Sequence, residues 1–113
     1  MARYHRNEAR EWAREHMNGV ANVTIPTMTS DFKRINTKAA RHDVETAINH
    51  GFVGTLACSE HATTLAQYAE FTRAMVEQAD GRIMVIHHAV FNSLEENIEA
   101  VKLAEEAGAD LVL

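Results

Sequence analysis

Histidine and acidic side chains follow two strand-like apolar runs of the sequence. Glu60 and His61 come directly after the run 52–58, and His87 and His88 end the run 83–88. Neighbouring residues of a strand point to opposite faces, so at most one of these two histidines can face the interior. With His61 and Glu60 it would offer the imidazole and carboxylate ligands of a metal site. A strand histidine is more often simply hydrogen-bonded, so we predict no metal and no cofactor and keep the metal site as an alternative.

Residues able to act as nucleophiles are few. Cys58 is the only cysteine, which excludes an intrachain disulfide, and a free cysteine is more typical of a buried small apolar side chain than of a nucleophile. The three lysines are Lys33 in a connection, Lys38 at a helix start and Lys102 late in a helix. None is placed at the carboxyl end of a strand, where barrel enzymes do their chemistry. We therefore expect none of these residues to act as a catalytic nucleophile.

The composition excludes several classes of partner. The formal net charge is −5 and the acids are spread along amphipathic stretches, so no basic footprint for nucleic acid is present. No run reaches the ~18 apolar residues of a membrane span, and the opening residues 1–17 lack the apolar run of a signal peptide. We expect no nucleic acid and no membrane partner. The single cysteine is consistent with a reducing, cytoplasmic location.

The elements that carry these residues recur with a regular period. Strand-like runs begin near Val20, Phe52, Ile83 and Leu111, at roughly the 30-residue scale of a strand-helix unit. The runs are apolar on both faces, as in buried parallel sheets. The period predicts an α/β fold with parallel strands and right-handed crossovers. It leaves an open doubly wound sheet and a closed barrel as alternatives.

Three amphipathic helices are predicted between the strands by their capping residues. Asn36 is a plausible N-cap, and Thr64 with Gln67 has the spacing of a capping box. Ser93 with Glu96 repeats this spacing before an apolar stripe. That stripe consists of Leu94, Ile98, Val101 and Ala104.

A polar helix is also predicted at the N-terminus, from about residue 7 to residue 18. We interpret residues 1–18 as a helical arm or barrel-bottom cover. Residues 19–113 are then the N-terminal part of a barrel, incomplete because the chain stops within the fourth strand.

Four blocks of the sequence carry a family resemblance, in order and at the right spacing. They are the Thr-Ile-Pro at 24–26, the Gly-Phe-Val-Gly at 51–54, the Gly-Arg-Ile-Met-Val-Ile at 81–86 with Asn-Ser at 92–93, and the Gly-Ala-Asp at 108–110. From Gly19 to Leu113 the sequence resembles the dihydrodipicolinate synthase / N-acetylneuraminate lyase family. The resemblance implies the first three and a half units of a (β/α)₈ TIM barrel.

The same resemblance implies a chemistry. Family members are Schiff-base lyases and aldolases in which a lysine of a later strand condenses with a 2-oxo acid such as pyruvate, and a tyrosine of another later strand relays protons. Both positions would lie beyond Leu113, so this chain alone should be inactive. A homo-oligomer binding a small-molecule 2-oxo acid is expected of the whole protein. A non-catalytic half-barrel that pairs its open edges with another copy is the remaining alternative.

The substrate-binding loop is where the sequence departs from the family. The family has Gly-Thr-Thr-Gly-Glu after its second strand, where hydroxyls and amides hold the substrate carboxylate; this chain has 57–60 Ala-Cys-Ser-Glu. Alignment on Glu60 places Ala57 and Cys58 at the threonine positions, whereas alignment on Leu65 places Cys58 and Ser59 there. Ser59 is then the one comparable hydroxyl, with Thr63 and Thr64 as possible substitutes. The residues predicted to bind substrate are Cys58, Ser59, Glu60 and His87. The competing interpretation of this loop is a solvated segment in which Glu60 caps a helix.

Overall fold

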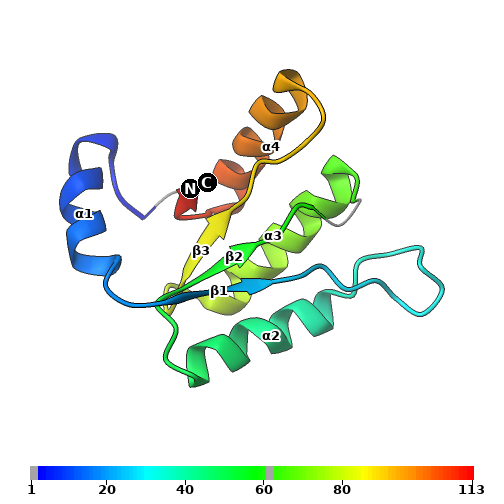
Figure 1. Cartoon of the computed structure of the whole chain (residues 1–113), viewed down its shortest axis with the longest axis horizontal. Coiled ribbons are helices and arrows are strands. Elements are labelled where there is room, and N and C mark those ends of the chain that lie inside the picture. The colour runs from blue at the N-terminus through cyan, green and yellow to red at the C-terminus, as the bar shows by residue number, and fades with distance from the viewer. Residues whose placement is uncertain (1–2, 61–62) are drawn as a thin grey trace.

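The computed structural model describes residues 3–60 and 63–113, in which strands and helices alternate (Figure 1). A short 3-10 turn, η1 (Arg6–Glu8), leads into α1 (Ala9–His16). The elements that follow are β1 (Ala21–Thr24), α2 (Thr37–Asn49), β2 (Gly54–Ala57), α3 (Leu65–Ala79), β3 (Met84–His87), α4 (Leu94–Ala107) and β4 (Leu111–Val112). All four predicted strands and all four predicted helices are present, with shorter strands than the apolar runs suggested.

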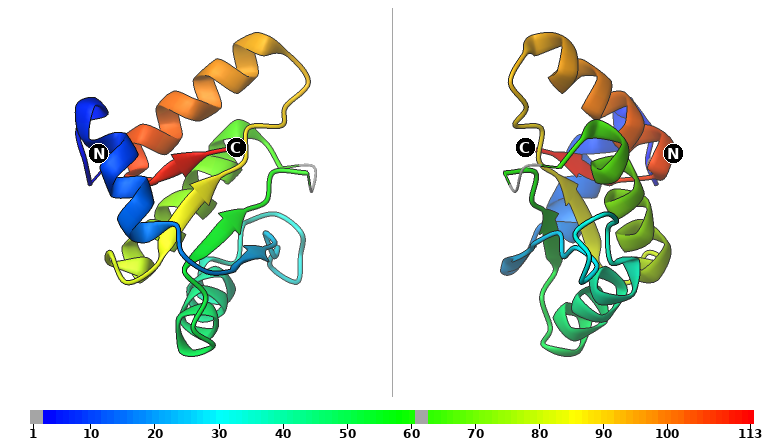
Figure 2. Two further views of the ribbon diagram at one scale, coloured as in Figure 1. Left: turned by 60° about the vertical axis from the view of Figure 1, so that its left-hand side comes forward. Right: turned by 90° about the vertical axis from the view of Figure 1, so that its right-hand side faces the viewer.

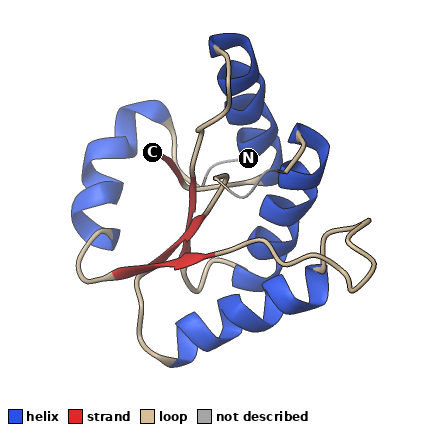
Figure 3. Ribbon diagram, turned by 45° about the vertical axis from the view of Figure 1, so that its right-hand side comes forward, coloured by secondary structure: helices blue, strands red, loops and turns tan. Residues whose placement is uncertain are grey.

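The four strands form one parallel sheet in the order β1-β2-β3-β4. Thr24 pairs with Ala57, Ala57 with His87, and His87 with Val112, so the carboxyl ends of the strands lie at one edge. Helices α2, α3 and α4 all cover the same face of this sheet (Figures 2 and 3). Consecutive parallel strands with every crossover helix on one side make a segment of a closed barrel, because a doubly wound sheet has helices on both faces. The predicted partial barrel is confirmed.

The helix-facing side of the sheet is the core. Ala57 and Val85 point into a buried cluster with side chains of α2 and α3, among them Tyr68, Phe71 and Met75. These residues are between 0 and 1% exposed, so this side of the sheet is closed to water.

The opposite face of the sheet is open. On this face, one residue from each strand lines an apolar cavity of about 320 Å³, and these four residues pair with one another across the sheet. They are Val23, Leu56, Ile86 and Leu111. Val23 is 53% exposed. This side is the interior side of the barrel. The expectation of strands covered on both faces fails at Val23 of β1, whereas Leu56 of β2 and Ile86 of β3 are half-buried there.

The helix starts follow the predicted capping residues. The Asn36 side chain accepts a hydrogen bond from Ala39 N, and Thr64 and Gln67 form both bonds of their capping box. Ser93 also caps α4 by accepting from Glu96 N, whereas the Glu96 carboxylate accepts from Asn92 N, so the second predicted box is half formed.

The predicted apolar stripe of α4 was wrong in part. Ala104 is buried as expected and so is Ala100, but Leu94 is 70% and Ile98 48% exposed. Ala100 and Ala104 are thus the buried residues of α4, Val101 of the predicted stripe is half-buried, and Leu94 and Ile98 face outward.

The N-terminal segment lies at the amino ends of β3 and β4. The Arg3 guanidinium donates to the Asp110 carboxylate (Nε to Oδ1, 2.6 Å) and to the Gly81 carbonyl, and the Tyr4 hydroxyl donates to the Asp110 carbonyl. Tyr4 stacks on Trp12 of α1. Among the described residues, no helix is long and apolar enough to cross a bilayer.

Candidate functional site

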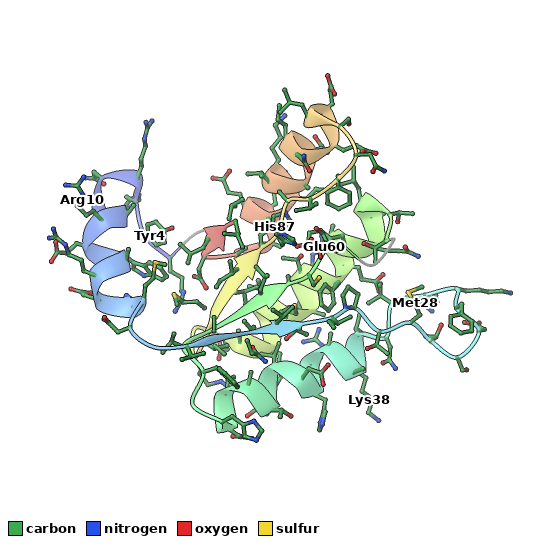
Figure 4. The ribbon with its side chains drawn as sticks, viewed as in Figure 1. Tyr4, Arg10, Met28, Lys38, Glu60 and His87 are labelled. Atoms are coloured by element: carbon green, nitrogen blue, oxygen red, sulfur yellow. The ribbon has the colours of Figure 1, made fainter. Side chains whose placement is uncertain are left out.

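The connections that follow β2 and β3 meet at the carboxyl edge of the sheet (Figure 4). Ser59 is 5% exposed, and its Oγ accepts a hydrogen bond from the backbone N–H of Val90 at 3.2 Å. A cavity of about 430 Å³ opens beside this contact, lined by Ser59, Glu60, Thr63, Val90, Phe91 and Asn92. The two strand ends therefore share one mouth, as the parallel arrangement predicted.

Two hydroxyl groups are available at this cavity. Because Ser59 Oγ accepts from Val90, its own proton remains free to be donated to a ligand oxygen. Thr63 Oγ1 is buried and has no hydrogen-bond partner within residues 3–60 and 63–113. Thr64, by contrast, uses its hydroxyl to cap α3, where it accepts from Gln67 N. Ser59 and Thr63 thus bring two hydroxyl-bearing side chains to the lining of the cavity, a pair whose O–H groups suit a carboxylate.

Glu60 lines the cavity at its exposed side, whereas Cys58 does not line it. Cys58 is 6% exposed, and its N–H donates to Thr24 O of β1. The interpretation of Cys58 as a buried small side chain is confirmed. Of the four predicted binding residues, the structure brings Ser59 and Glu60 to the cavity.

His87 lies on the other side of the strand, toward the helices. It is 1% exposed, and its ring packs against the Tyr68 ring with centroids 4.8 Å apart. Burial, together with the neighbouring His88, lowers the pKa of His87 to about 4. Neither ring nitrogen has a hydrogen-bond partner in the described part of the chain. His87 is therefore outside the cavity lining, whereas its neighbour Ile86 faces the barrel interior.

The metal alternative rested on His61, which lies outside the described residues. Within residues 3–60 and 63–113, no three His, Cys, Asp or Glu side chains gather where they could hold an ion. The lysines Lys33, Lys38 and Lys102 are all exposed, on the β1–α2 connection, on α2 and on α4. None of them lies at a strand end, as predicted.

Tyr68 contributes to the site from α3, a role that the sequence did not indicate. Its hydroxyl donates to the Ala57 carbonyl at the end of β2 and accepts from His88 N just after β3. Burial raises the pKa of Tyr68 well above its ordinary value, so the hydroxyl keeps its proton and remains a donor. Sequence reasoning could not find this role, because a contact between residues 68, 57 and 88 depends on the tertiary fold.

Known proteins resemble this chain in sequence and in structure. The model of the Dihydrodipicolinate synthetase family matches residues 16–113. The 4-hydroxy-tetrahydrodipicolinate synthase of Anaeromyxobacter sp. (strain Fw109-5) is 41% identical over 95 residues, which cover 80% of this chain and 32% of that protein. The one from Maridesulfovibrio salexigens is 40% identical over 83 residues, covering 70% and 28%. The chain thus spans about a third of the length of these relatives.

A solved structure shows the same fold. The dihydrodipicolinate synthase from Oceanobacillus iheyensis superposes with a TM-score of 0.78 at 20% identity, covering 92% of this chain and 35% of that one. Since the family model matches nearly the whole chain after the first helix, this polypeptide belongs to the dihydrodipicolinate synthetase family.

Proposed function

We propose that the protein carrying this segment is a lyase or aldolase that acts on a 2-oxo acid such as pyruvate through a Schiff base. The observation that carries the proposal is the Ser59 hydroxyl, which lies at the cavity and has a proton free to donate. The match to the family model supports the proposal from the sequence. In this proposal, residues 1–113 supply part of the rim that binds the substrate carboxylate.

The cavity favours one orientation of a 2-oxo acid. Its hydroxyl donors are Ser59 and Thr63, which offset the loss of water around a carboxylate. The Glu60 carboxylate, at the exposed side, would repel that group. We therefore place the substrate carboxylate against the two hydroxyls and its carbonyl carbon toward the barrel axis. Phe91 and Val90 supply the apolar wall for the remaining carbon atoms.

The covalent step requires a lysine from outside residues 1–113. In that step a neutral lysine amine adds to the 2-oxo carbon, the carbonyl oxygen takes one proton from the amine and one from a general acid and leaves as water, and a cationic imine forms. The exposed lysines of this chain are not placed for it. What Ser59 and Thr63 contribute is orientation, because they hold the anionic end of the substrate while the carbonyl reacts.

Borohydride trapping with labelled pyruvate tests the mechanism. The 113-residue chain should stay unlabelled, whereas the chain joined to the remaining strands of its barrel should be labelled on a lysine. An unlabelled extended protein would remove the Schiff-base mechanism.

A pair of serine variants tests the role of Ser59. In the extended protein, Ser59→Ala should raise KM for pyruvate by about tenfold or more, since one hydrogen bond to a charged group is worth roughly 1.5–3 kcal/mol. Ser93→Ala is the matched control, because it also removes a hydroxyl that accepts from a backbone N–H, at 3.1 Å, but outside the cavity lining. Equal KM values for the two variants would contradict the assignment of Ser59.

The proposal also includes a cytoplasmic location and a homo-oligomeric state. The lone buried Cys58 supports a reducing compartment, and membership of a family whose enzymes are usually homo-oligomeric supports the oligomeric state. Sedimentation of the extended protein checks the second point, and a monomer at micromolar concentration would contradict it.

A further inference from the structure

We call the line of backbone hydrogen bonds between two neighbouring strands a seam. The three seams of the sheet differ in one hydrogen bond, just where the strands end. Between β1 and β2, Cys58 N donates directly to Thr24 O at 3.1 Å. Between β3 and β4, Leu113 N donates directly to His87 O at 2.8 Å. In both seams the donor is the residue that follows the last pair of the strands. The parallel register thus continues for one further hydrogen bond.

The seam between β2 and β3 lacks this direct bond. Ala57 pairs with His87, so the equivalent bond would join His88 N to Ala57 O. Instead His88 N donates to the Tyr68 hydroxyl at 2.9 Å, and the Tyr68 hydroxyl donates to Ala57 O. One side-chain oxygen has been inserted into the ladder. Two hydrogen bonds in series separate the backbone atoms by about 4 to 5 Å, against about 2.9 Å for a direct bond.

A second hydroxyl continues the separation toward the cavity. Two residues further along, Val90 N donates to the side chain of Ser59 rather than to a backbone carbonyl. The cavity lined by Ser59, Thr63 and Phe91 begins at this point. The seam of the sheet that a hydroxyl holds open is therefore the seam from which the cavity opens.

We propose that Tyr68 is a positioning residue whose hydroxyl sets the width of this cavity and thereby the size of the 2-oxo acid that it accepts. The size selection rests on the proposed function, whereas the separation of the strand ends does not. Tyr68 is suited to the role because it is 1% exposed and its ring is held between His87 (4.8 Å) and Phe91 (5.5 Å). The hydroxyl is thus carried by a rigid helix rather than by the loops that it separates.

Tyr68→Phe tests the separation without any ligand. Phenylalanine keeps the ring and removes the inserted oxygen, so His88 N and Ala57 O should close to a direct bond. A through-hydrogen-bond NMR coupling between these two groups should be absent in the wild-type chain and present in the variant. A coupling already present in the wild type, or still absent in the variant, would overturn the proposal.

The wild-type chain offers a measurement that does not depend on the variant folding. A Tyr68 hydroxyl buried between two backbone groups should give a slowly exchanging proton with a cross-peak to the His88 amide. Its absence would also overturn the inserted hydroxyl.

Binding of three 2-oxo acids of increasing size tests the selection. Glyoxylate, pyruvate and 2-oxobutanoate are titrated into the extended protein while the Ser59 and Val90 amide shifts are followed. Tyr68→Phe should lower the preference for 2-oxobutanoate over glyoxylate by about tenfold, the usual effect of a carbon atom that no longer fits. An unchanged preference would reject the role of Tyr68 in size selection, even if the NMR coupling showed a direct bond between His88 N and Ala57 O.

Tyr4→Phe is the matched control. It removes a tyrosine hydroxyl that donates to a backbone carbonyl, that of Asp110, at the opposite end of the sheet. It should leave the size preference unchanged, and an equal shift in both variants would point to a general loss of stability and reject the role of Tyr68. A wild-type extended protein that binds none of the three acids would count against the proposed function, while the NMR coupling still decides the separation.

Discussion

The buried His87 predicts a specific dependence of stability on pH. Its pKa in the folded chain is lowered to about 4 from 6.5, first by burial and second by His88. The unfolded chain therefore binds a proton that the fold excludes. The stability that the neutral ring contributes is complete above pH 6.5 and is lost as the pH falls from 6.5 toward 4.

The size of the effect follows from the shift. One pKa unit corresponds to about 1.4 kcal/mol, so the free energy of unfolding should fall by about 2 kcal/mol between pH 7 and pH 5 and by about 3 kcal/mol by pH 4. The carboxyl of Glu45, hydrogen-bonded by Arg82 and Gln78, has its pKa lowered to about 2. Its contribution is lost below pH 4.5, so the window from pH 5 to pH 7 separates the histidine from it.

Urea unfolding of the 113-residue chain at pH 7 and at pH 5 measures this loss. His87→Leu keeps an apolar contact with Tyr68 and removes the titratable ring, so the variant should lose most of the pH dependence. At pH 7 the variant should be about as stable as the wild type, because it also removes two ring nitrogens that have no partner among the described residues. His42→Gln on the exposed side of α2 should keep the wild-type dependence. If the free energy of unfolding of the wild type and of His87→Leu fell by the same amount between pH 7 and pH 5, the pH dependence could not be assigned to His87.

Two further substitutions test the ends of the fold. Arg3→Met should lower the free energy of unfolding by roughly 1 to 3 kcal/mol, measured by thermal or urea unfolding. The substitution leaves the buried Asp110 carboxylate with Val85 N as its remaining partner among the described residues. An unchanged stability would show that the N-terminal segment is not bound to Asp110. Phe32→Gly should raise the melting temperature slightly, because Phe32 is 81% exposed at φ 59°, where a side chain costs about 1 kcal/mol. Phe32→Ala keeps the Cβ and should not raise the melting temperature. Equal melting temperatures for the two variants would contradict the backbone argument.

Much of the fold was predictable because it is encoded locally. Asn36, Thr64 and Ser93 each satisfy a backbone donor within three residues, so their positions mark the helix starts without knowledge of the rest of the chain. The faces of the elements were less predictable. Leu94 and Ile98 have the spacing of a core stripe, yet α4 packs through Ala100 and Ala104, because which face of a helix is covered depends on the elements packed against it.

The candidate site was predictable as a place and less so as a set of residues. Parallel strands bring their carboxyl ends together, so the segments at Ser59 and after His87 were expected to share one mouth, and the Ser59–Val90 hydrogen bond joins them. Which histidine faces inward could not be predicted, because the run before His87 is apolar at every position. Tertiary packing decides which residues of this strand face the helices. Val85 points toward the helices and Ile86 points away from them.

Tyr68 shows why a site of this kind depends on more than the loops that line it. The cavity lies between two connections, but the atom that keeps their strands apart comes from α3 and replaces a bond that both neighbouring seams make directly. Substitutions at a buried helix position, remote from any substrate atom, should therefore alter which acids fit, whereas substitutions of Ser59 or Thr63 should alter how tightly each of them is held.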